Sequence, residues 1–171
     1  MTPAPKAKDK TPRDPDAPRP IGKNRQAYFQ YEILQKLECG LALRGTEVKS
    51  LRQGHVSFVD SYATVQDGEL LLVGLNIAEY AMGNRANHIT TRTRKLLAHR
   101  SQIRKLKLET ERGGMTLVPL SMYWKGAHAK VEIGVARGKR QFDKRDTIKK
   151  REDAREKDRV VKAYASRSRG E

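Results

Sequence analysis

The strongest constraint on the fold of this chain is a series of short β-rich runs joined by glycine turns. Two runs flank Asp67-Gly68 in VSFVDSYATVQDGELLLVGLNI, and an Asp-Gly pair between hydrophobic runs favours a β-hairpin. Two more flank Lys125-Gly126 in MTLVPLSMYWKGAHAKVEIGVARG. In the last run Val131, Ile133 and Val135 alternate with polar or small residues, the pattern of a strand with one buried face. The chain is therefore predicted to consist mainly of antiparallel strands.

Further strand and helix signals precede the first hairpin. The segment AYFQYEILQKLECGLALRG is rich in aromatic and aliphatic residues, which favour strands, and Leu37, Cys39 and Leu41 alternate within it. The next segment, GTEVKSLRQGH, is typical of one short helix, with Thr46 placed to cap its start and Gly54 to end it.

A change of period between the two hairpins predicts a second helix. In TTRTRKLLAHRSQIRKLKLETERGG the aliphatic residues recur at helical spacing with cations between them, and Gly113-Gly114 ends the run. These aliphatic residues are Leu96, Leu97, Ile103, Leu106 and Leu108. In the run that follows, Pro119 has no N–H to donate, so its strand is expected at a sheet edge or bulged there.

Several short antiparallel strands with two helices fit a small closed barrel better than a sandwich. We predict a mainly β fold, an OB-type antiparallel β-barrel with flanking short helices, over residues 23–137. Residues 1–22 hold six of the seven prolines and are predicted to be a disordered N-terminal extension. Residues 138–171 are predicted to be a basic C-terminal tail that is disordered when free.

The tail carries much of the positive charge. The formal net charge is +16, and residues 137–171 contribute +7, from fourteen Lys or Arg against seven Asp or Glu. The segment DKRDTIKKREDAREKDRVV has helix-forming residues but too few apolar ones for a buried stripe, so it should stay largely unfolded alone. Such a charge attracts polyanions, which makes nucleic acid or a ribosomal surface the expected partner. An anionic membrane fits less well, because no segment pairs a basic face with a broad apolar one.

Three features predict a cytoplasmic protein. Cys39 is the single cysteine, so no disulfide can form within the chain. The N-terminal segment has prolines and charges but no apolar core of a signal peptide. No run approaches the roughly 20 apolar residues that a membrane-spanning helix needs.

Signals of catalysis are weak, and we expect neither enzymatic activity nor a cofactor or metal. The four histidines are scattered, at none of the spacings of a metal motif, and the interpretation as ordinary residues is favoured. They are His55, His88, His99 and His128. Cys39 has the position of a core residue rather than a nucleophile. Glu38, Glu47 and Asp60 would have to converge in one pocket to hold a catalytic metal, and nothing in the sequence indicates that.

The motif TRTRKLL carries a binding signal outside the tail. In extended backbone Arg92 and Arg94 would share a face and straddle phosphates, with Lys95 beside them. The alternative is a solvated edge strand whose charges prevent aggregation. Beside the cation Arg25, stacking surfaces like those of RNA-binding proteins are offered by Tyr28, Phe29 and Tyr31, which could equally be the first core residues of the barrel.

Three longer strings can be read together: GLALRGTEVKSLRQGHVSFVDSYA, TRTRKLL and LSMYWKGAHAKVEIGVARGKRQFDKRDTIKKRE. Their sequence, order and spacing resemble the SsrA-binding protein (SmpB) family, from about Asn24 to Arg159. The resemblance implies an OB-type barrel that binds the tRNA-like domain of transfer-messenger RNA and enters ribosomes stalled on messages without a stop codon. It also implies that the tail becomes helical in the decoding centre and the empty messenger channel.

The RNA-facing positions of the family carry over one at a time. The predicted RNA-binding residues are Asn24, Tyr31, Glu38, Arg92, Arg94, Lys95, Leu97 and Lys130. As an acid, Glu38 cannot attract phosphate, so the resemblance implies that it positions bases or orients a neighbouring arginine. Leu97 matches an apolar contact, and Lys130 lies on the outward face of the last strand.

The start of the tail matches the family element used at the decoding centre. The residues concerned are Gly138, Lys139, Phe142, Asp143, Lys144 and Arg145. Many members have histidine where this chain has Phe142. Phenylalanine can stack on a nucleobase but cannot exchange a proton, so stacking is the role expected here.

The main interpretation is a monomeric, non-enzymatic RNA-binding adaptor in ribosome rescue. Its expected partners are transfer-messenger RNA and the ribosome, with elongation factor Tu and alanyl-tRNA synthetase reached through the shared RNA. A ribosome-associated RNA chaperone is the second interpretation, and it would discriminate little between structured RNAs. A metal-dependent nuclease is the third.

Overall fold

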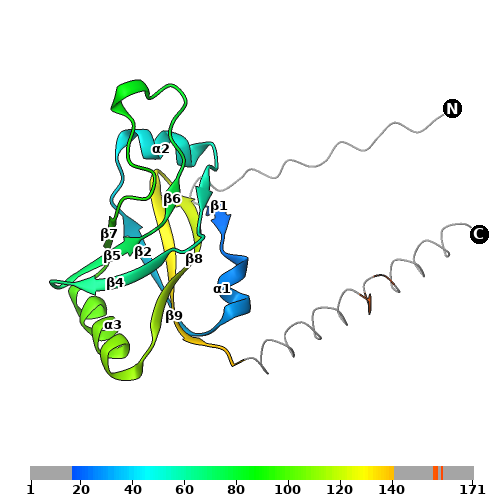
Figure 1. Cartoon of the computed structure of the whole chain (residues 1–171), viewed down its shortest axis with the longest axis vertical. Helices are drawn as coiled ribbons and strands as arrows, with labels where there is room; N and C mark the ends of the chain where they lie inside the picture. The colour runs from blue at the N-terminus through cyan, green and yellow to red at the C-terminus, as the bar shows by residue number, and fades with distance from the viewer. Residues whose placement is uncertain (1–16, 141–155, 158, 160–171) are drawn as a thin grey trace, which may run out of the picture.

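The protein is built around a closed antiparallel β-barrel (Figure 1). The structure, a computed structural model, describes residues 17–140, 156, 157 and 159. The barrel strands are β2 (Tyr31–Leu41), β4 (Tyr62–Gln66), β5 (Glu69–Val73), β7 (Arg94–Leu97), β8 (Thr116–Lys125) and β9 (His128–Gly138). They pair in the order β8-β4-β5-β7-β2-β9, and β9 pairs back onto β8, which closes the sheet. The predicted mainly β fold with a small antiparallel barrel is confirmed.

Both predicted hairpins are present. Strands β4 and β5 are joined by Asp67 and Gly68, whose φ angles of 50° and 77° are those of a type I′ turn. Strands β8 and β9 are joined at Lys125-Gly126, where Gly126 also has positive φ. The twist of a type I′ turn matches the twist of the flanking strands, so the residues of the turn are enough to direct the β4–β5 hairpin.

The core fills the barrel interior with aliphatic side chains. It includes Cys39, Leu41, Leu70, Leu72, Leu96, Leu117, Met122, Val131, Ile133 and Val135. The predicted alternation in β9 is confirmed, because Val131, Ile133 and Val135 are all buried. The prediction that Cys39 is a core residue is also confirmed, and burial raises the pKa of its thiol to about 11, which keeps it protonated.

Strand β1 (Arg19–Lys23) lies inside the segment predicted to be disordered. It pairs with β8, with Arg19 opposite Trp124, and Ile21 packs against the barrel core. The prediction for residues 1–22 is therefore wrong for Arg19–Gly22. The prolines suggested disorder, but one apolar contact and pairing with β8 order this stretch, an interaction that composition does not reveal.

Helix α1 (Arg25–Gln30) replaces part of the strand predicted from Ala27 onward. The Asn24 side chain starts this helix by accepting a hydrogen bond from the Ala27 N–H at 3.0 Å. Its amide nitrogen donates to the Pro119 carbonyl at 3.0 Å, which fastens the helix start to β8. Local capping and the burial of Ala27 thus outweigh the strand preference of the aromatic residues.

Helix α2 (Gly45–Arg52) is the predicted short helix, but its N-cap lies two residues before Thr46, the residue predicted to cap it. Its N-cap is Arg44, whose N–H donates to the Glu47 carboxylate at 2.6 Å. Thr46 was predicted to cap the helix; its hydroxyl instead contacts Nδ1 of His88 at 3.0 Å. Gly54 has the left-handed φ expected just past the helix end.

Helix α3 (Arg100–Gly113) is the second predicted helix, and left-handed Gly114 caps its C-terminal end. The prediction that Leu96 and Leu97 belong to it is wrong, because both lie in strand β7. Pro119 lies in β8, a strand with neighbours on both sides, and the register of the β8–β9 pair shifts between Pro119 and Ser121. Of the two predicted placements for Pro119, the bulge is the correct one.

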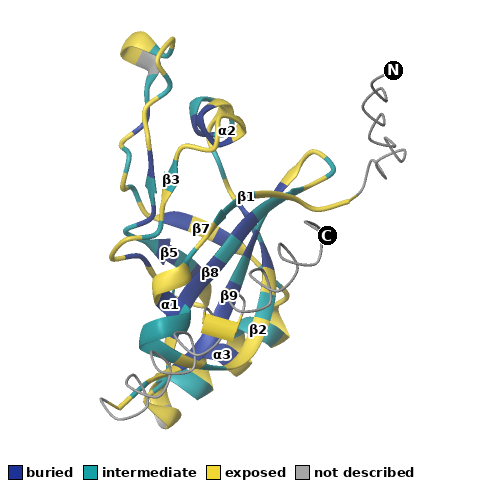
Figure 2. Ribbon diagram, turned by 90° about the vertical axis from the view of Figure 1, so that its right-hand side faces the viewer, coloured by how far each residue is buried: buried dark blue, intermediate teal, exposed yellow. Residues whose placement is uncertain are grey.

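A long connection projects from one end of the barrel. Strands β3 (Val56–Ser57) and β6 (Asn76–Ile77) form a small second sheet. The chain between β6 and β7 contains a 3-10 turn, Asn84–Ala86, and its tip is largely exposed (Figure 2). Among the described residues no helix is long and apolar enough to cross a membrane.

Candidate nucleic-acid interface

One row of residues runs across four strands on the outside of the barrel. Leu97 of β7 lies opposite Gly40 of β2, Gly40 opposite Lys130 of β9, and Lys130 opposite Tyr123 of β8. Residues directly opposite on paired strands point to the same side of a sheet. Val131, next to Lys130, is fully buried, so the row itself faces outward.

The neighbours of this row on the same side complete a surface that we call the outer face. The outer face consists of Glu38, Gly40, Lys95, Leu97, Tyr123, Lys125 and Lys130. It includes four of the residues predicted to bind RNA. Tyr123, Lys125 and Gly40 were not predicted. Cross-strand pairing with Lys130, inferred from the hairpin turn at Gly126, would have indicated Tyr123 as its neighbour.

Glu38 organises the cations of the outer face. Its carboxylate accepts a hydrogen bond from the Tyr123 hydroxyl at 2.5 Å. Lys130 Nζ lies 3.3 Å and Lys125 Nζ 3.7 Å from the other carboxylate oxygen. The Tyr123 hydrogen bond and the two lysines lower the pKa of Glu38, while burial and the bond to Glu38 raise the pKa of Tyr123. Glu38 therefore stays charged and holds Lys130, Lys125 and Tyr123 together.

Leu97 gives the outer face an apolar platform. Its side chain is 54% exposed, which is unusual for leucine. A Cβ atom at Gly40 would lie 3.2 Å from the Leu97 Cβ, so a larger residue at position 40 would crowd the Leu97 side chain. Leu97 and Lys130 line a shallow depression of about 490 Å³, and Lys95 pairs with Glu69 across β7 and β5. The outer face thus combines exposed cations with apolar and aromatic surface.

Arg92 and Arg94 do not lie on the outer face; both converge on Glu47 of α2. Arg94 Nε lies 2.8 Å from Glu47 Oε1, and Arg92 contacts both carboxylate oxygens, at 2.8 and 2.5 Å. The side chains of Arg94 and Glu47 are fully buried, whereas that of Arg92 is 21% exposed. The two arginines do share a side, as predicted, but it is the inward one. The expectation that Arg94 contacts phosphate is therefore wrong for this structure.

The N–H groups of the buried Arg94 side chain donate hydrogen bonds to Glu47 and to backbone carbonyls. Besides Glu47, Arg94 donates to the carbonyls of Leu75, Arg92 and Thr90, at 2.5, 3.0 and 2.8 Å. Burial alone would raise the pKa of Glu47, but hydrogen bonds from Arg92 and the Arg44 N–H, with the charge of Arg94, lower it overall. This cluster joins α2, the β6–β7 connection and β7 in one ionic network.

The remaining predicted residues lie at the opposite end of the barrel, near α1. Asn24 uses its side chain for the cap and the Pro119 contact. Tyr31, opposite Gly138, packs against a second small core beneath α1. Lys139 donates from its N–H to the Gln30 carbonyl at 3.0 Å, and from Nζ to the Tyr28 carbonyl at 3.2 Å, which places its charge at the helix C-terminus.

The other predicted tail residues lie outside the described part of the chain. They are Phe142, Asp143, Lys144 and Arg145. Within the part that the structure describes, no group of three or more His, Cys, Asp or Glu residues is arranged to hold a metal ion. His88 is buried and hydrogen-bonded to Thr46 and the Ile77 carbonyl, an ordinary structural histidine.

The fold and the outer face define a small basic β-barrel protein of the OB type. The family model described as SmpB protein matches residues 21–163. The chain is 49% identical over 143 residues to the SsrA-binding protein of Carboxydothermus hydrogenoformans, covering 84% of this chain and 96% of that protein. It is 51% identical over 141 residues to that of Treponema pallidum, covering 82% and 92%. The chain belongs to the SmpB family.

A solved relative agrees with the fold. A chain from a structure described as "tmRNA-SmpB: a journey to the center of the bacterial ribosome" is 48% identical and superposes with a TM-score of 0.60. The match covers 74% of this chain and 92% of the solved one. The predicted family is therefore confirmed by sequence and by structure.

Proposed function

We propose that this protein is a non-enzymatic adaptor that binds the tRNA-like domain of transfer-messenger RNA and delivers it to stalled ribosomes for trans-translation. Family membership supports this, since the relatives are SsrA-binding proteins and the solved relative is described with tmRNA and the ribosome. The observation that carries the proposal for this chain is the outer face, where lysines surround an exposed leucine and a tyrosine. RNA recognition needs both cations for phosphates and apolar surface for sugars and bases.

In this proposal the residues of the outer face have distinct tasks. Lys130 and Lys95 contact phosphates, and Leu97 packs against a sugar or base. Glu38 acts as a positioning residue, because its carboxylate already engages Tyr123 and two lysines. Asn24 and Tyr31 support this end of the barrel rather than contact RNA. The Asn24 side chain is used in capping α1, and Tyr31 packs against the small core beneath that helix.

The tail carries the second half of the proposed function. Gly138, Lys139 and the segment 142–145 enter the decoding centre, and the remaining tail occupies the empty messenger channel as a helix. Its charge of +7 supports attraction to a phosphate-lined channel, and Phe142 is suited to stacking on a base. The described tail residues Glu156, Lys157 and Arg159 are helical and exposed. Elongation factor Tu and alanyl-tRNA synthetase join the complex through the RNA.

The proposal is tested by the RNA that the protein retains. The full chain is purified from bacterial lysate after ultraviolet cross-linking, and its RNA is sequenced. An adaptor yields transfer-messenger RNA far above its share of total RNA, even when excess bulk tRNA is added to the lysate before irradiation. An RNA chaperone would return a broad mixture, and this result would overturn the proposal.

Truncation separates the two halves of the function. Ending the chain after Arg140 keeps the Lys139 contacts with α1, so the barrel stays intact. RNA affinity should remain within about threefold, since the outer face is unchanged, while peptide tagging on stalled ribosomes should be lost. Binding is measured by filter retention and tagging in a reconstituted translation system. A truncated chain that still supports tagging would contradict the role given to the tail.

A further inference from the structure

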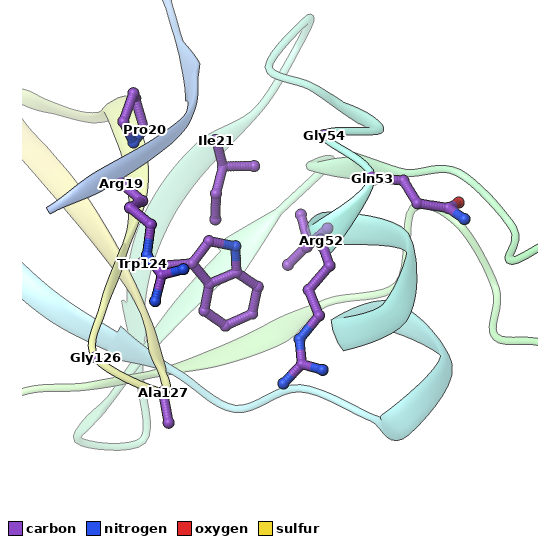
Figure 3. Close-up of a pocket in the computed structure, with 10 residues that line it drawn as sticks. Arg19, Pro20, Ile21, Arg52, Gln53, Gly54, Trp124, Gly126 and Ala127 are labelled. Atoms are coloured by element: carbon purple, nitrogen blue, oxygen red, sulfur yellow. The ribbon is translucent and has the colours of Figure 1, made fainter. Parts of the chain in front are cut away.

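A cleft of about 790 Å³ opens at the mouth of the barrel, on a part of the surface outside the outer face (Figure 3). Its walls come from β1, the C-terminal end of α2 and the turn between β8 and β9. One wall comes from Arg19, Pro20 and Ile21 of strand β1, in a stretch that composition alone predicted to be disordered. The cleft therefore exists only because Arg19–Lys23 pairs with β8.

Trp124, the single tryptophan of the chain, lies at the centre of this cleft. It packs partly against the barrel core, and its remaining surface lines the cleft. Arg19 lies directly opposite Trp124 on the neighbouring strand, so the two side chains lie on the same side of the sheet. An indole that is held on the core and presented to solvent is a rigid stacking surface.

Two arginines flank the indole from different elements. Arg19 comes from β1 and Arg52 from the last turn of α2, and Figure 3 shows them on opposite sides of Trp124. No acidic residue lines the cleft. Neither guanidinium forms an ion pair with a carboxylate among the described residues, in contrast to Arg92 and Arg94. The cleft therefore has net positive charge beside an aromatic face.

We propose that this cleft binds one unpaired nucleotide of an RNA strand, with the base stacked on Trp124 and the phosphate between Arg19 and Arg52. An aromatic platform between cations is the chemistry that single-stranded RNA uses. An acidic peptide would satisfy the arginines but leave the indole unmatched. Trp124 also lines the depression that holds Leu97 and Lys130, so one RNA can continue from the outer face into the cleft. The proposal rests on the proposed function only in taking RNA as the ligand.

The intrinsic fluorescence of the full chain tests this directly, because Trp124 is its single tryptophan emitter. The protein is titrated with a ten-nucleotide single-stranded RNA, an abasic oligomer with the same number of phosphates, and polyglutamate. Stacking predicts strong quenching by the RNA and little by the abasic oligomer, although both bind through charge. Equal quenching by the abasic oligomer or by polyglutamate, or no quenching by RNA, would overturn the proposal.

Substitutions assign the cations. Arg19→Gln and Arg52→Gln should each lower the slope of log affinity against log salt for the single-stranded RNA by about 0.7. The matched control is Arg104→Gln on α3, an exposed arginine away from the cleft, which should leave the slope unchanged. An identical effect of all three variants would show that only general charge acts.

A conservative pair tests the stacking surface. Trp124→Leu should weaken binding of the RNA by about fivefold to a hundredfold in filter retention, and Trp124→Phe should restore most of it. Phe and Leu both keep the contact with the core apolar, so both variants are expected to fold. Circular dichroism checks this. Equal affinity of folded Phe and Leu variants would contradict stacking.

The source of the nucleotide is resolved by two further ligands. The fluorescence titration is repeated with the tRNA-like domain of transfer-messenger RNA and with purified small-subunit ribosomal RNA. Quenching by one of them identifies the RNA that supplies the nucleotide. Tight filter binding of the tRNA-like domain with no quenching by either RNA would refute the cleft and leave the proposed function standing. Quenching by the single-stranded RNA with no binding of the tRNA-like domain would refute the function and leave the cleft standing.

Discussion

Two sets of cations in this protein look alike in sequence but have opposite environments. Arg94 is fully buried on Glu47, with Arg92 beside it, whereas the side chains of Lys95 and Lys130 are 49% and 30% exposed. Arg94 and Lys95 are adjacent in the chain, and strand β7 turns one inward and the other outward. Of two adjacent cations in one motif, Arg94 therefore serves the fold, while Lys95 is left on the surface, where we propose that it contacts RNA.

The largest expected difference between the two regions is in stability. Glu47→Gln removes the charge that compensates buried Arg94 and should lower the free energy of unfolding by about 3–5 kcal/mol. The same substitution on the outer face, Glu38→Gln, should cost no more than about 1 kcal/mol, because Glu38 is solvent-exposed. Urea unfolding followed by Trp124 fluorescence measures both. Similar losses of unfolding free energy for the two variants would contradict the distinction between a structural buried cluster and an outer face that adds little stability.

For RNA affinity we expect the reverse, with the larger effect from substitutions on the outer face. Lys95→Gln combined with Lys130→Gln should weaken binding of the tRNA-like domain by about tenfold per lysine at low salt and lower the salt slope by roughly 0.9 for each. Lys107→Gln on α3, also exposed and ion-paired, is the matched control and should change neither quantity. Filter binding from low to high salt provides the measurement. If the slope of log affinity against log salt were the same for the double variant and the wild-type protein, Lys95 and Lys130 would not contact phosphates.

The smallest effect concerns the pH dependence of stability. The folded state lowers the pKa of Glu47 below its ordinary value of 4.5, so its contribution is fully present above pH 4.5 and lost as the pH falls through the folded pKa. The free energy of unfolding of the wild-type protein should therefore fall more steeply between pH 5 and pH 3 than that of Glu47→Gln. Urea titrations at several pH values test this. Parallel curves would mean that Glu47 titrates alike in the folded and unfolded states.

Much of the barrel could be predicted because its signals are local. The turns at Asp67-Gly68 and Lys125-Gly126 depend on neighbouring residues, and the buried face of β9 follows from its period of two. Strand β1 was missed because its order comes from β8, a hundred residues away in sequence. Helix α1 was missed because its start depends on the Asn24 cap and the Pro119 carbonyl.

Some residues of the outer face could also be predicted, because they belong to local motifs. Lys130 and Leu97 were predicted from the motifs that contain them, and the structure places both beside Gly40 on the outer face. The prediction that Arg94 contacts RNA rests on its charge, whereas strand alternation points its side chain inward. Leu96 is a core residue and Arg94 lies two residues before it, so the alternation already indicated an inward side chain. Its partner, Glu47, lies in a different element, which the sequence alone does not connect to it.

The most direct test of this account is residue-specific chemical modification of the unsubstituted protein, with and without the tRNA-like domain. Lysines are acetylated, arginines are modified with a dicarbonyl reagent, and mass spectrometry quantifies each site. The account predicts that Lys95 and Lys130 react in the protein alone and are protected by RNA, while Arg94 reacts in neither state. Ready modification of Arg94 in the protein alone, or unchanged reactivity of both lysines on RNA binding, would contradict it.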